Sequence, residues 1–120
     1  MLPDLSGYIQ TSPLGRRVQI KYAKIDAATS GDNTLVAAVT TKKIRVLSMI
    51  AVMTGTAVTI RFESGASGTA LTGQMQVTQG GGFVLPYNPG GWFETVAGDL
   101  LNMELSGAQS VDGMLSYIEV

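Results

Sequence analysis

The chain has 120 residues, the length of a single domain, and it contains no cysteine and no histidine. These absences exclude a disulfide framework, cysteine-ligated metals, and the serine or cysteine nucleophiles that a histidine activates. Only 14% of the residues are charged, compared with about 25% in an average soluble domain. We therefore expect part of the surface to be covered in an oligomer or a larger assembly, unless the abundant Thr, Ser, Asn, Gln and Gly residues supply the polarity.

The net charge of −1 conceals an uneven distribution along the chain. Residues 1–61 hold eight cations and three acids, a net +5, whereas residues 62–120 hold six acids and no cation, a net −6. This split predicts that the two parts pair with each other, within one fold or between subunits. Nucleic acid is not the expected partner, because only Tyr22 lies among the cations as a base-stacking aromatic. The candidate electrostatic contacts to an acidic protein surface are Arg16, Arg17, Lys42 and Lys43.

Residues 1–16 lack the basic and apolar regions of a signal peptide, so we expect synthesis in the host cytoplasm without export. They form an N-terminal arm that is either a frayed terminus or a segment docked on a partner. Its apolar residues, more numerous than a solvated tail needs, are Leu2, Leu5, Tyr8 and Ile9. The longest apolar stretch, residues 46–53, is broken by Ser48 and is too short to cross a bilayer, so no membrane contact is expected.

From residue 17 onward the chain is predicted to be β almost throughout, because a quarter of all residues are Val, Ile or Thr. Apolar and polar residues alternate with period two in several segments, which is typical of half-buried antiparallel strands. The alternating apolar positions are Val18, Ile20 and Tyr22; Val58, Ile60 and Phe62; Leu101, Met103 and Leu105; and Leu115 and Tyr117. Turn sequences recur about every ten residues, so residues 17–120 are predicted to form one all-β domain, an antiparallel sandwich, jelly roll or barrel of eight or nine strands.

No motif in the chain indicates catalysis or cofactor binding. The glycine run at residues 80–82 lacks the flanking strand, helix and lysine of a phosphate loop. Glu94 and Asp99 are the nearest acid pair, and nothing in the sequence places them in a cleft. No loop has the aspartate spacing of a calcium site. We therefore expect no enzyme activity, catalytic residue, cofactor, metal or small-molecule substrate.

The most distinctive segment is residues 85–95, LPYNPGGWFET, which concentrates three of the chain's eight aromatic residues. Two prolines stiffen the loop, and two glycines allow a sharp reversal before the tryptophan. Its aromatic residues are Tyr87, Trp92 and Phe93. They could close one end of the core, anchor a subunit interface, or stack on a sugar ring.

The order of these segments resembles that of small β-sandwich virion proteins of tailed bacteriophages and prophages, the head decoration or cement type. The resemblance covers residues 17–120: a basic β segment leads to VTIRFESG and LTGQMQV, then LPYNPGGWFET, then AGDLLNMELSGAQSVDGMLSYIEV. The last segment also looks like the closing strands of tumour-necrosis-factor-like jelly rolls.

This resemblance implies an eight-stranded jelly roll that assembles as a homotrimer on the exterior of the virion capsid. Such a trimer would bind the major capsid protein and stabilise the head, without enzyme activity. The aromatic loop would then be an oligomer interface, and the N-terminal arm would dock on the shell. The alternative hypothesis is a carbohydrate- or receptor-binding β-sandwich module of a phage fibre or tail, with Trp92 and Tyr87 stacking on a ring.

Overall fold

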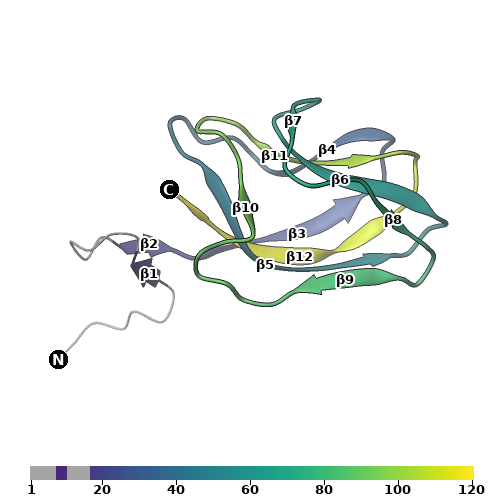
Figure 1. Cartoon of the computed structure of the whole chain (residues 1–120), viewed down its shortest axis with the longest axis horizontal. Coiled ribbons are helices and arrows are strands. Elements are labelled where there is room, and N and C mark those ends of the chain that lie inside the picture. The colour runs from purple at the N-terminus through teal and green to yellow at the C-terminus, as the bar shows by residue number, and fades with distance from the viewer. Residues whose placement is uncertain (1–7, 11–16) are drawn as a thin grey trace.

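The computed structural model describes residues 8–10 and 17–120, and within them the chain is entirely β, with no helix (Figure 1). No segment of this described part is therefore a helix that could cross a membrane. The strands are β1 (Tyr8–Gln10), β2 (Arg17–Gln19), β3 (Lys21–Ala27), β4 (Gly31–Val36), β5 (Ile44–Met53), β6 (Val58–Ser64), β7 (Thr69–Ala70), β8 (Met75–Val77), β9 (Gly82–Leu85), β10 (Phe93–Glu94), β11 (Leu101–Leu105) and β12 (Val111–Glu119).

Two antiparallel sheets pack face to face, which confirms the predicted β-sandwich (Figure 1). The first sheet has the order β9–β5–β12–β3, and the short β10 pairs with the same strand, β5, as β9 does. The second sheet has the order β4–β11–β6–β8, with β7 as a short addition beside β6. From β3 onward the chain changes sheet at each step except along β6–β8 and β9–β10, and the first long strand, β3, pairs with the last, β12. This is the eight-stranded jelly-roll arrangement.

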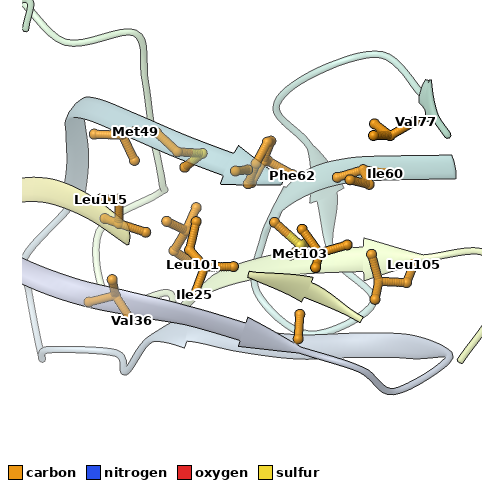
Figure 2. Close-up of a cluster of buried hydrophobic side chains, with 14 of the residues drawn as sticks. Ile25, Val36, Met49, Ile60, Phe62, Val77, Leu101, Met103, Leu105 and Leu115 are labelled. Atoms are coloured by element: carbon orange, nitrogen blue, oxygen red, sulfur yellow. The ribbon is translucent and has the colours of Figure 1, made fainter. Parts of the chain in front are cut away.

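The core lies between the sheets, and the predicted alternation locates it correctly in the second sheet. Val58, Ile60 and Phe62 of β6 are buried, as are the alternating apolar residues of β11. Met103 lies opposite Phe62 in the ladder between these strands. The first sheet contributes side chains such as Ile25, which point into the same layer (Figure 2). Burial of these branched and aromatic groups is the main favourable contribution to folding.

The predicted orientation of the Tyr22 side chain is wrong. The alternation predicts Tyr22 on the same apolar side as Val18 and Ile20, yet it is 67% exposed. The extended pattern is interrupted at Ile20, between β2 and β3, so the alternation does not continue from one strand to the next. In β3 the buried positions are Ile25 and Ala27 instead.

The N-terminal arm contributes one short strand. β1 pairs antiparallel with β2, with Tyr8 opposite Gln19 and Ile9 opposite Val18. The resulting hairpin projects from one end of the sandwich (Figure 1). Leu2, Leu5 and Arg16 lie outside the described residues, and so do the side chains of Tyr8, Ile9 and Arg17.

Candidate functional site

The outer face of the first sheet carries most of the exposed apolar surface. Of the eight large hydrophobic side chains exposed in the described part of the chain, six lie on this face or at its edge. They are Tyr22, Ile50, Val52, Val84, Tyr87 and Met114, and we call this surface the apolar face. Single exposed apolar residues are common on proteins, but a contiguous exposed group of this kind is typical of binding surfaces.

The strand register explains why these residues form one patch. Val84 of β9 lies opposite Ile50 of β5, Ile50 lies opposite Met114 of β12, and Met114 lies opposite Lys24 of β3. These residues form a row across all four strands, because directly opposed residues point to the same side of a sheet. Three apolar side chains in one row give the patch its centre.

Two serines are the polar side chains nearest the centre of the apolar face. Ser48 and Ser116 lie opposite each other on β5 and β12, and their hydroxyl oxygens are 2.5 Å apart. Each hydroxyl therefore has a hydrogen-bond partner within the face. Covering the face would not leave these groups unpaired, which is the usual cost of burying polar atoms.

A shallow groove of about 310 Å³ runs over the apolar face. Ile50 and Met114 line its floor together with the two serines, and Tyr87 forms part of its wall. Charged groups stand only at the end and edge of the face. Lys24 Nζ lies 3.9 Å from Asp26 Oδ2 on β3, and Asp112 accepts a hydrogen bond from the Thr54 hydroxyl at 2.6 Å.

The loop between β9 and β10 is fixed to β5 at both ends. Asn88 N donates to the Leu47 carbonyl at 2.9 Å, and Trp92 N donates to the Val46 carbonyl at 2.8 Å. Between them, Gly91 has a φ of +85°, and a Cβ added there would lie 2.4 Å from Arg45 Cγ. Glycine is required at this turn for both its conformation and its size. The loop is therefore a well-ordered part of the sheet edge.

The three aromatic residues of this segment take different positions. Tyr87 is 55% exposed on the apolar face, whereas Trp92 is 43% exposed and its Nε1 donates to the Pro86 carbonyl at 2.8 Å. Phe93 is half-buried and packs against the core, with its ring 5.0 Å from that of Phe62. The segment thus both closes the sandwich edge and presents exposed aromatic surface.

Trp92 and Phe93 also line a second hollow, an apolar pocket of about 290 Å³ at the sandwich edge. Its other lining residues are Phe62, Thr72, Met75, Phe83 and Leu85. Thr72 Oγ1 accepts from the Phe62 amide and donates to the Gly73 carbonyl, so it offers no free group. A sugar site needs polar groups placed beside its stacking ring, and this pocket provides none.

The outer face of the second sheet is polar and carries a charged cluster. Glu63 is fully buried there, where it accepts from Asn102 Nδ2 at 2.9 Å and from Arg61 Nε at 2.9 Å. The Arg61 guanidinium also contacts Glu104 Oε2 at 2.5 Å. Burial opposes ionisation of Glu63, but hydrogen bonds from its neighbours outweigh it and lower the pKa of this carboxyl. The adjacent Glu63 raises the pKa of Glu104.

Glu63 is buried because the chain after β6 folds back over this face. Ser67 reaches Asp32 on the far strand β4, donating to its carboxylate through both the amide, at 2.9 Å, and the hydroxyl, at 2.8 Å. Asn102 donates to the same carboxylate at 2.7 Å. These bonds lower the pKa of Asp32. Alternation with the buried Phe62 puts Glu63 on the outer face, but alternation gives no sign of the turn after β6.

The charge split seen in the sequence is resolved largely within the chain. Lys21 pairs with Glu119 at 3.0 Å, and Lys43 and Arg45 both approach Glu94, at 3.7 and 3.4 Å. Arg61 also contacts Glu63 and Glu104. All these pairs join a cation of residues 1–61 to an acid of residues 62–120. Of the predicted electrostatic contacts, Lys43 is thus paired, and Lys42 is half-buried beside it.

The hydroxyl–carboxylate contacts have structural roles. Ser64 donates to Asp99 at 2.8 Å, and its oxygen also accepts from the Val96 amide at 2.8 Å, which fixes the β10–β11 connection. Within residues 8–10 and 17–120, no group of three or more acidic side chains is arranged to hold a metal ion.

Comparisons with known proteins add a structural relative. No family model and no curated protein matches the chain. Among solved structures, a similar chain comes from Bacillus endospore appendages, described as a novel family of disulfide-linked pili. It is 22% identical, with a TM-score of 0.54, and the match covers 85% of this chain and 86% of that chain. This likeness supports the fold.

Proposed function

We propose that the protein is a non-enzymatic structural subunit, a decoration or cement protein that assembles as a trimer on the exterior of a phage capsid. The observation that carries this proposal is the contrast between the two outer faces of the sandwich. One face exposes a contiguous apolar patch, whereas the other is polar and internally paired. A chain with so few charges and one uncovered apolar face is suited to an assembly rather than to free solution.

In this role the two faces have separate tasks. Contacts among copies cover apolar surface, and other surfaces of the trimer bind the major capsid protein. Each contact with the shell can be weak. Once one subunit of the trimer has bound the rigid lattice, the effective concentration of the other two subunits at their sites is high. The trimer and the capsid role rest on the resemblance of residues 17–120 to head decoration proteins.

The endospore-appendage neighbour suggests a second candidate, a subunit of a pilus-like filament. Its fold is shared over most of both chains, but it is described as disulfide-linked, and this chain has no cysteine. A filament of this protein would therefore be held by non-covalent contacts. The carbohydrate-binding alternative is less well supported, because the Trp92 Nε1 donor is already used by Pro86 and the adjoining pocket is apolar.

The test combines mass measurement with localisation. Light scattering at micromolar concentration is expected to give the mass of a trimer. Particles of the phage or prophage that encodes the chain are then probed with an antibody in the electron microscope, and the label is expected on heads. A monomer that is absent from heads would overturn the proposal. Extended filaments of the purified chain would favour the pilus-like candidate, and label on tail fibres would favour the receptor-binding one.

A further inference from the structure

We propose that the apolar face is the contact between copies, so that a second copy of this chain covers Tyr22, Ile50, Val84 and Met114 in the assembled protein. This inference deepens the proposed function, because it assigns one face of the sandwich to self-assembly. It leaves the opposite, polar face and the loops for the shell.

The size of the apolar face fits this role. Strands β9, β5, β12 and β3 hold 4, 10, 9 and 7 residues, and each residue covers about 16 Å² of a sheet surface. The face therefore offers on the order of 500 Å² per copy, or about 1,000 Å² for two copies, which lies at the lower limit for a specific interface. In a trimer, three such faces turned toward a common threefold axis would each be covered by the other two copies.

The polar groups of the face are compatible with being covered by an apolar partner. The Ser48 and Ser116 hydroxyls form one hydrogen bond with each other, so each keeps a partner when water is excluded from the centre of the face. The groove over Ile50 and Met114 has room for a side chain from the facing copy. A partner rich in charge would instead find no charged group at the centre of the face to pair with.

The edge of the face supports a second copy in particular. It carries a cation, Lys24, and two acids, Asp26 and Asp112, of which Lys24 and Asp26 are exposed and Asp112 is half-buried. An edge that bears both signs does not repel the same edge of another copy, as an edge of a single sign would.

The test uses two valines with nearly equal exposure. Val84 is 65% exposed on the apolar face, and Val96 is 60% exposed in the loop that crosses to the second sheet. Val84→Glu places a charge in the proposed contact and is expected to weaken self-association about 100-fold or more, leaving a monomer with unchanged circular dichroism. Val96→Glu, the same change elsewhere, is expected to leave the mass of the assembly unchanged.

A second measurement exploits the absence of cysteine. Near the symmetry axis of a self-packed face, equivalent residues of different copies approach each other. Met114→Cys is therefore expected to give disulfide-linked chains under mild oxidation, and Val96→Cys is not. This readout does not depend on any loss of stability in the glutamate variant.

The possible results separate this inference from the proposed function. If Val84→Glu stays assembled and Met114→Cys does not cross-link, the apolar face is not the contact between copies, although the protein can still be a capsid decoration trimer. If the wild-type chain is monomeric, the inference also fails. If assembly through the face occurs but the protein is absent from phage heads, the inference stands and the proposed function fails.

Discussion

Phe93 stacks on Phe62 at the edge of the sandwich, with ring centroids 5.0 Å apart and ring planes 29° from parallel. Phe62 belongs to the second sheet and Phe93 to the first, so this contact joins the two sheets. Phe83 completes the group by meeting the edge of Phe62 at 6.2 Å. The aromatic loop is thus attached to the core through Phe93, whereas the neighbouring Trp92 is partly exposed.

We expect Phe93→Ala to lower the free energy of unfolding by about 2 kcal/mol, because it removes a half-buried ring and leaves a void beside Phe62. Trp92→Ala should cost clearly less, since that ring is 43% exposed. Urea unfolding of both variants measures the difference. Equal losses would mean that the exposed tryptophan contributes as much to the core as its neighbour does.

Gly91 and Gly98 form a matched pair of positions at which the rigidity of the aromatic loop can be tested. Both have left-handed backbone, with φ values of +85° and +88°, but only at Gly91 would a Cβ collide with a neighbour, Arg45. Gly98→Ala is expected to cost about 1 kcal/mol in backbone strain alone, and Gly91→Ala more than that. Thermal unfolding compares them. Similar shifts for both variants would show that the arginine side chain moves aside freely.

The carboxyl cluster makes stability depend on pH. Glu63 and Asp32 have lowered pKa values in the folded chain, so the unfolded chain takes up protons first as the pH falls. Their contribution is present above the ordinary carboxyl pKa and is lost as the pH falls through the folded values. Glu104 acts in the opposite direction because its pKa is raised.

We therefore expect Glu63→Gln to destabilise the protein at neutral pH and to reduce the loss of stability on acidification. The buried amide can no longer pair with the Arg61 guanidinium, which keeps its charge. Glu104→Gln is the control, since it removes the group that titrates in the opposite sense. Urea unfolding across the acid range tests both variants. An acid profile that Glu63→Gln leaves unchanged would contradict this assignment.

Salt should have little effect on self-association. The cations and acids of the two parts of the sequence pair within one chain, as Lys21 does with Glu119, so screening weakens contacts inside the subunit rather than between copies. We expect sodium chloride to leave the assembly intact and sulfate to strengthen it, because sulfate favours burial of apolar surface. Light scattering over a salt series is the measurement. Dissociation at moderate sodium chloride would indicate ion pairs across the subunit contact.

The second sheet could be predicted from the sequence because its strands alternate cleanly. β6 and β11 place polar residues outside and apolar residues inside, and this pattern fixes which side is buried. The same pattern could not reveal the burial of Glu63, since that depends on a turn that reaches Asp32 on a different strand. A tertiary contact of this kind leaves no periodic signal.

The apolar face was hidden from sequence reasoning for a different reason. Strand β5 is almost continuously apolar, so Ile50 and Val52 could not be told apart from buried neighbours such as Met49 and Ala51. The composition of the 85–95 loop does point to Tyr87 and Trp92. The groove beside Tyr87 depended on the pairing of β5 with β9 and β12, which the sequence did not specify.

The topology also sets a limit on how this protein can be made. Among the strands that the structure describes, β3 forms the edge of the first sheet and pairs only with β12, some ninety residues later in the chain. The first sheet therefore cannot close until β12 has emerged from the ribosome. Folding dominated by such distant pairings is slow, and during that interval the apolar strands are open to association with other nascent chains. Conditions that slow synthesis or raise expression should therefore affect the yield of soluble protein more than its final stability.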